Sequence, residues 1–210
     1  ANVPIQQQTG AKILIHKLDE PMLTDPELNL RKLFLGKGDG GKADRLLEEG
    51  DIINVDVSTI LDGYFSDASR MFTIGNISPE ADKLVRVTKE CVELGLKEAK
   101  PWGHLGDIAY AINTHARANG YSVVEDIGGH GIGLAFHEDP FVSYVTPKGS
   151  EMVLVPGMMF TIEPMINEGS PDFFIDEDNG WTVYTIDDGL SAQVEYMVLI
   201  TEDGAEVLTK

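Results

Sequence analysis

Two runs of β-branched and aromatic residues, 51–61 and 64–74, flank the dipeptide Asp62-Gly63 and constrain the fold more than any other feature of the chain. Asp-Gly is a preferred centre of a two-residue hairpin turn, because both turn residues must adopt positive φ angles. The pattern therefore predicts two long antiparallel strands joined by a tight turn, with Leu61 opposite Tyr64.

This register places two carboxylates on one face of the hairpin. Asp67 lies opposite Ser58, and Asp56 is a diagonal neighbour of Asp67, roughly 7 Å away at the backbone. Two like charges so close repel one another unless a cation or a proton joins them. Val55 and Val57 lie on the other face, which favours burial of at least one side. The alternative interpretation is a solvated sheet face.

Beyond the hairpin, the pattern predicts two helices followed by strands. Ser78 is the predicted N-cap of a helix that ends before Pro101. Its predicted buried stripe is Leu84, Val85, Thr88, Val92 and Leu96. A second helix is predicted from about Gly106 to Asn119, with Gly120 as its stop. The predicted strands that follow are 121–124, 141–145, 158–166, 181–185 and 192–200. This order of elements predicts an α+β fold with a largely antiparallel sheet.

The first 44 residues give weaker signals. They predict a strand over 11–18, a short helix from Asp25 through Phe34, and a glycine-rich connector over 36–41. The N-terminus has no basic stretch followed by an apolar run, so we expect no signal peptide.

Composition excludes several classes of function. The 210 residues carry 35 acidic and 16 basic side chains, a net charge of −19, so nucleic acid would be repelled. No apolar run reaches the ~18 residues of a membrane helix. The only cysteine, Cys91, excludes an internal disulfide and a multi-cysteine zinc site, and a cytoplasmic location is expected.

Three further residues are candidate ligands. His130 stands among four glycines in 128–133, and glycine allows the backbone to approach a ligand closely. Glu163 and Glu195 each lie within an apolar strand pattern. The alternatives are a glycine-rich turn with an incidental histidine and two glutamates that point to solvent. His137, seven residues after His130, offers a second imidazole, although a lone histidine there is more often a surface residue.

Taken together, four acids and one glycine-framed histidine form an oxygen-rich set with one nitrogen. Such a set fits hard to borderline divalent ions. The set comprises Asp56, Asp67, His130, Glu163 and Glu195. Five ligands suit two ions that share a water, an arrangement that generates hydroxide near neutral pH and polarises a carbonyl.

These five residues resemble the metal set of the pita-bread metallopeptidases. Five motifs in the same order resemble type I methionine aminopeptidases, namely 129–133, 136–138, 160–165, 180–183 and 191–193. The resemblance runs from about Arg45 to the end of the chain. It implies a pita-bread fold, a curved antiparallel sheet backed by helices with its first half shortened. It also implies a metallopeptidase catalytic domain over 45–210, preceded by an atypical N-terminal segment over 1–44.

The resemblance implies a role for each ligand. Asp56 and Asp67 would bind metal, and Asp67 would bridge the two ions. His130 and Glu163 would complete the coordination of one ion, and Glu195 would also bridge the two. The cofactors would be two divalent ions, cobalt, manganese or iron, with zinc as a further option. The reaction would be hydrolytic removal of N-terminal methionine from peptides and nascent chains by a hydroxide bound to both metals.

The resemblance also implies roles for residues around the metals. Glu163 would be the general base, and His137 would hydrogen-bond the scissile amide or its tetrahedral product. Phe136 and Trp181 would wall the pocket for the methionine side chain.

The chain departs from the family pattern in two places. Family members carry an Asn-Glu-x-x-x-His-Gly-x-Pro stretch ahead of the first aspartate, whereas residues 35–42 here contain no histidine or cysteine. His16 is the only imidazole upstream. Tyr196 follows Glu195 where the family usually has histidine. The alternative function is therefore a catalytically impaired peptide-binding module that retains metal, and the sequence does not identify a partner that would cover the shortened half. A prolyl-bond peptidase is disfavoured by the motifs around His130 and His137.

Overall fold

The computed structural model describes residues 14–17, 45–178 and 180–209. The chain divides into two compact units, one of residues 1–51 with 73–77 and one of residues 52–72 with 78–210. In the first unit, β1 (Leu14–His16) pairs in parallel with β2 (Arg45–Leu47). The helix predicted from Asp25 and the connector over 36–41 lie outside the described residues.

The second unit begins with the predicted hairpin, formed by β3 (Ile52–Leu61) and β4 (Tyr64–Thr73). Asp62 and Gly63 have φ angles of 52° and 87°, as a two-residue turn of this type requires. Ser58 Oγ donates a hydrogen bond of 2.9 Å to Asp67 Oδ1, and the hydroxyls of Thr59 and Ser66 are 2.7 Å apart. Both contacts confirm the predicted register.

The buried face of the hairpin is not the face that carries the apolar side chains of Val55 and Val57. Val55 and Val57 are 42% and 54% exposed, so the expected burial of at least one side of the hairpin does not fall on their face. The buried face is instead the one that carries Asp67 and Ser69, which are 4% and 0% exposed.

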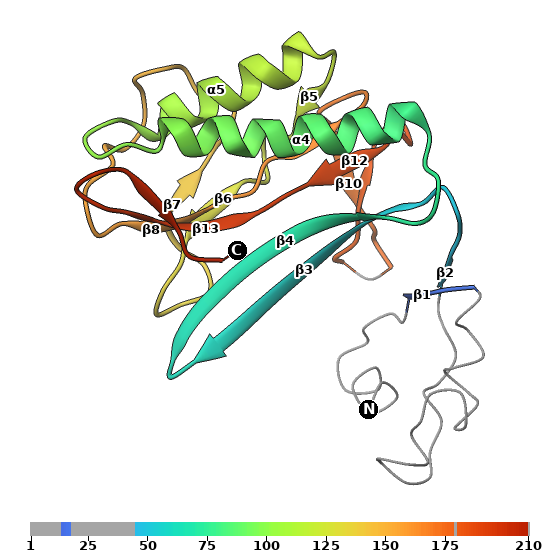
Figure 1. The fold of residues 1–210 in the computed structure, drawn as a ribbon, viewed down its shortest axis with the longest axis horizontal. Helices are drawn as coiled ribbons and strands as arrows, with labels where there is room; N and C mark the ends of the chain where they lie inside the picture. Colours follow the sequence, from blue (N-terminus) through green and yellow to red (C-terminus); the bar gives the residue numbers. More distant parts are fainter. Residues whose placement is uncertain (1–13, 18–44, 179, 210) are drawn as a thin grey trace, which may run out of the picture. The chain divides into compact units, whose positions relative to one another are not determined.

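Two helices follow, α4 (Pro79–Glu98) and α5 (Leu105–Ala118), as predicted. The helix α4 begins where Ala81 N donates to Ser78 Oγ at 3.1 Å, and Gly120, with φ of 86°, follows α5. Of the predicted stripe on α4, three residues are buried and two are half-buried; the buried ones are Leu84, Thr88 and Val92. The two helices lie side by side in one layer over the strands (Figure 1).

The remaining strands of this unit form three antiparallel sheets. A five-stranded sheet has the order β14-β13-β8-β6-β7, a three-stranded sheet the order β12-β9-β5, and β10 pairs with β11. The strands are β5 (Ser122–Val123), β6 (Gly129–Gly131), β7 (Glu138–Val142), β8 (Met159–Ile162), β9 (Met165–Asn167), β10 (Phe173–Ile175), β11 (Val183–Thr185), β12 (Ser191–Gln193), β13 (Tyr196–Ile200) and β14 (Ala205–Val207).

Two of the predicted long strands are interrupted, and each interruption holds a predicted ligand. The run 158–166 divides into β8 and β9 at Glu163-Pro164, and the run 192–200 divides into β12 and β13 at Val194-Glu195. In both cases the chain passes between the five-stranded and the three-stranded sheet. Pro164 has no N–H to donate to a ladder, which favours the break. Strands β6, β10 and β14 were not predicted, because three residues carry too short a pattern.

The hydrophobic core lies between the helix layer and the sheets. Its fully buried side chains include Leu84, Ile108, Ile112, Phe160, Ile166 and Val198. Among the residues that the structure describes, no helix is both long and apolar enough to span a membrane. A hydrogen bond from Glu195 N to the carbonyl of Ser69 joins β4 to the strand break before β13.

Candidate metal centre

Three predicted ligands converge from separate elements. Asp67 on β4, His130 on β6 and Glu195 between β12 and β13 each offer one ligand atom, and these atoms all lie within 4.8 Å of one another. Asp67 and Glu195 are 4% and 1% exposed, and His130 is half-buried. Two carboxylates and an imidazole at this separation form a donor set that suits a divalent ion.

Glu195 supplies the physical test of whether a cation fits. Both of its carboxylate oxygens are buried and have no hydrogen-bond partner. Burial raises the pKa of Glu195 to about 9, and the charges of Glu163 and Asp67 add to the shift. A buried carboxylate without a partner is costly, so it requires either a proton or a cation. The donor set around it therefore fits a metal ion.

Glu163 lies beside this group but is held differently. Its Oε1 is 3.4 Å from His130 Nε2 and accepts a hydrogen bond of 2.6 Å from Thr161 Oγ1. Its Oε2 accepts one of 2.9 Å from Gln193 Nε2. Burial raises the pKa of Glu163 to about 7, even though these two hydrogen bonds lower it. A carboxyl with this pKa can exchange a proton near neutral pH.

Asp56 contacts the group through Asp67. As a residue Asp56 is exposed, but partial desolvation of its carboxyl raises its pKa to about 6, and the charge of Asp67 and a hydrogen bond to it add to the shift. Asp56 is not among the three residues whose ligand atoms converge.

The positions next to His130 require glycine for a steric reason. A side chain at Gly129 or Gly131 would clash with the backbone carbonyl of Thr161 or Asp139. His130 N donates to Thr161 Oγ1 at 3.0 Å, and its Nδ1 lies 3.0 Å from the carbonyl of Gly131. These contacts leave Nε2 facing the carboxylates. Burial lowers the pKa of His130, which favours the neutral imidazole that binds metals.

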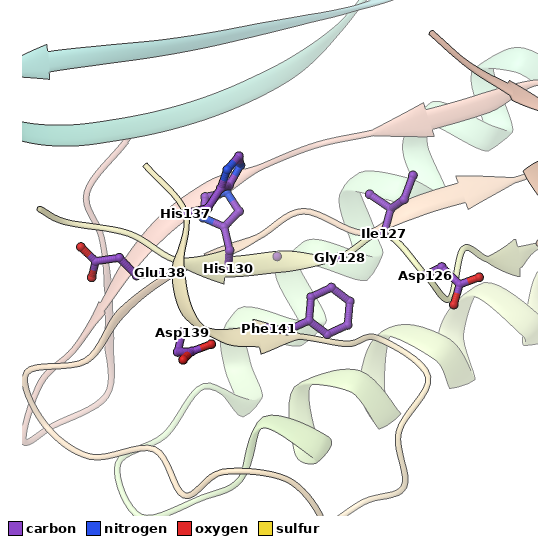
Figure 2. Close-up of a pocket in the computed structure, with 9 residues that line it drawn as sticks. Asp126, Ile127, Gly128, His130, His137, Glu138, Asp139 and Phe141 are labelled. Atoms are coloured by element: carbon purple, nitrogen blue, oxygen red, sulfur yellow. The ribbon is translucent and has the colours of Figure 1, made fainter. Parts of the chain in front are cut away.

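A cleft of about 550 Å³ opens beside the centre, lined by residues between 126 and 141. His130 and His137 point into the same space, with ring centroids 4.4 Å apart, while Glu138 points away from them (Figure 2). The Phe136 ring lies 5.8 Å from that of His130. Trp181 is 83% exposed and lies outside this lining.

The structure adds supporting residues that the sequence analysis did not single out. Thr161 bonds both His130 and Glu163, and Gln193 bonds Glu163. The hydroxyl of the buried Tyr144 accepts a 2.7 Å hydrogen bond from the backbone N–H of Glu163. The one sequence signal for Thr161 and Gln193 is their position within the quoted motifs, and Tyr144 lies outside all of them.

The sequence profile of metallopeptidase family M24 matches residues 37–202. The chain belongs to family M24. Membership implies the use of a divalent metal, in agreement with the converging ligands. The predicted resemblance to the pita-bread metallopeptidases is thereby confirmed.

Named relatives of this M24 chain are methionine aminopeptidases. Methionine aminopeptidase A of Synechocystis is 53% identical over 79% of this chain and 65% of its own length. The enzyme of Escherichia coli K12 is 44% identical over 79% of this chain and 62% of its own. The crystal structure of methionine aminopeptidase from Rickettsia prowazekii has a TM-score of 0.79 at 42% identity, with 82% of this chain and 69% of that chain covered. These matches confirm the pita-bread fold. The M24 chain spans about 60 to 65% of the length of the curated relatives it matches.

Proposed function

We propose that this protein removes N-terminal methionine from peptides and nascent chains by metal-dependent hydrolysis, and that residues 45–210 form the catalytic domain. The observation that carries the proposal is Glu195, a buried carboxylate without a hydrogen-bond partner that faces Asp67 and His130. The named relatives, which are methionine aminopeptidases, support the choice of reaction.

The proposed centre holds two divalent ions, of cobalt, manganese or iron, with zinc as a further option. The residues that would hold these ions are Asp56, Asp67, His130, Glu163 and Glu195. Such ions supply a water of lowered pKa and polarise the scissile carbonyl.

Within this proposal Glu163 is the general base. Its carboxylate would take a proton from the attacking water and pass that proton to the leaving amine. Thr161 and Gln193 each donate to one of its oxygens, so the carboxylate is held in one orientation.

His137 and two aromatic residues complete the proposed substrate site. His137 is exposed beside His130 and would donate a hydrogen bond to the scissile amide or its tetrahedral product. Phe136 and Trp181 would contact the methionine side chain. The net charge of −19 argues against nucleic acid as a partner, and the lone cysteine, Cys91, favours a cytoplasmic location.

The second candidate function is a peptide-binding module that retains metal but turns over slowly. It is favoured by residues 35–42, which contain no histidine or cysteine ahead of Asp56. Loss of one transition-state donor commonly costs ~10²–10³ in rate. We therefore expect a catalytic efficiency below the common enzyme range of ~10⁴–10⁸ M⁻¹s⁻¹.

Metal analysis followed by cleavage of Met-Ala-Ser in excess Mn²⁺ or Co²⁺ separates these functions. Bound metal with release of methionine supports the aminopeptidase. Bound metal with peptide binding but no release supports the module. Absence of bound metal would contradict both, and an efficiency within the common range would show that residues 35–42 do not limit the rate. In that case, loss of activity in His16→Ala would identify His16 as the missing donor.

A further inference from the structure

Arg70 lies on β4, three residues after Asp67, and its guanidinium contacts three backbone carbonyls. Nη1 donates to the carbonyl of Ser69 at 2.7 Å and to that of Glu195 at 2.5 Å, and Nη2 donates to the carbonyl of Thr209 at 3.0 Å. The guanidinium carbon lies 4.2 Å from the centroid of the Tyr196 ring, in a cation–π contact. One side chain thus joins β4, the break before β13 and the C-terminal segment.

The backbone of Glu195 is held on both sides by residues of β4. Its N–H donates to the carbonyl of Ser69 at 3.1 Å, and its carbonyl accepts from Arg70. The Glu195 carboxylate has no hydrogen-bond partner of its own. The direction in which this carboxylate points is therefore controlled by its backbone, and hence by Ser69 and Arg70.

We propose that Arg70, supported by the ring of Tyr196, is a positioning residue that holds Glu195 in the orientation required for metal binding. This inference rests on the proposed metal centre. The planar guanidinium holds its N–H groups at fixed angles, so it can donate to several carbonyls at once. A lysine ammonium cannot reproduce this geometry. Tyr196 occupies the position at which type I methionine aminopeptidases usually have histidine. Its ring fixes the plane of the Arg70 guanidinium.

The affinity for metal gives the direct test. Groups that orient a metal ligand commonly contribute about 10- to 100-fold to affinity. We expect Arg70→Ala to bind Mn²⁺ about 10- to 100-fold more weakly by calorimetry and to alter the visible absorption of bound Co²⁺. Arg70→Lys should recover part of the affinity, and Tyr196→Phe should match the unmodified protein, whereas Tyr196→Ala should not.

Two controls separate positioning from general stability. Arg86→Ala removes an exposed arginine that pairs with Glu90 on α4, and should leave metal affinity unchanged. Ser78→Ala removes the α4 cap and should lower stability without changing metal affinity or the Co²⁺ spectrum.

The outcomes distinguish the inference from the function on which it rests. Metal affinity and a Co²⁺ spectrum that stay unchanged in Arg70→Ala would overturn the role of Arg70 while the metal centre stands. Failure of the unmodified protein to bind Mn²⁺ or Co²⁺ would overturn the centre and the inference together. If Arg70→Ala does not fold, unchanged affinity in both Arg70→Lys and Tyr196→Ala would overturn the inference in the same way.

Discussion

Glu163 and Glu195 both lie at strand breaks but differ in burial and in their neighbours, since Glu163 is half-buried and Glu195 is buried. Glu163 accepts hydrogen bonds from Thr161 and Gln193, whereas neither oxygen of Glu195 has a hydrogen-bond partner. Donors around Glu163 would orient the carboxylate that is proposed to move a proton. The absence of such donors around Glu195 leaves both oxygens available to a cation.

This difference predicts the effect of Glu163→Gln. We expect the catalytic constant to fall by ~10²–10⁴-fold with little change in the Michaelis constant, because a general base acts in the transition state. Steady-state kinetics on Met-Ala-Ser would measure it, with metal content determined in the same sample. A variant that retains both its metal and its rate would remove Glu163 from the mechanism.

The converging ligands predict the effect of Asp67→Ala. We expect loss of at least one bound ion, since Asp67 is buried and belongs to the group of converging ligands. Metal counting after dialysis would measure it, with the exposed Glu93→Gln on α4 as a matched control. An unchanged stoichiometry would contradict the proposed centre.

At the scale of the elements, the turn between β3 and β4 sets how the aspartates face each other. A shift of the register by one residue would move the side chains of one strand to the opposite face. The turn holds the register because Asp62 and Gly63 both adopt positive φ angles.

The turn therefore predicts opposite outcomes for two substitutions. Gly63→Val should lower the free energy of unfolding by about 1–2 kcal/mol, because a β-branched residue is strained at φ of 87°. Asp62→Asn should be close to neutral, since Asn-Gly suits the same turn. Urea denaturation would measure both, and equal stability of the two variants would show that the turn does not control the hairpin.

At the scale of the whole molecule, the carboxyl groups of the centre couple the stability of the protein to pH. Three carboxyl groups of the centre have pKa values raised to about 6, 7 and 9, namely Asp56, Glu163 and Glu195. The folded metal-free protein thus binds protons that the unfolded chain has already released. Its stability is highest below the ordinary carboxyl pKa and falls as pH rises toward about 9.

This linkage predicts how pH and metal act on stability. Between pH 5 and 8 the metal-free protein should lose stability as pH rises, with Glu195 alone contributing at most about 1.4 kcal/mol per pH unit. Saturating Mn²⁺ should abolish the loss, and its binding should release protons. Urea denaturation with and without a chelator would measure the first effect, and calorimetry in two buffers the second. Stability of the metal-free protein that rises over this range would contradict the burial of protonated carboxyls.

The sequence alone determined the local elements and the list of candidate ligands. The register of the hairpin followed from Asp62-Gly63, and the start of α4 followed from Ser78, because turns and caps depend on residues close in the chain. Asp67, His130 and Glu195 could be predicted as ligands, because acids inside apolar strands and a histidine among glycines are recognisable from the sequence alone.

Only the tertiary structure decided which of these residues meet and what holds them. Glu195 is bonded through its backbone to Ser69 and Arg70, more than a hundred residues away, and no periodic pattern reports such a partner. The sequence pattern also could not predict that the face carrying Val55 is exposed. Alternation shows which side chains share a face but not which face another element covers. Hydrogen-bond partners and burial depend on segments far apart in sequence, and packing of the strands on one core brings those segments together.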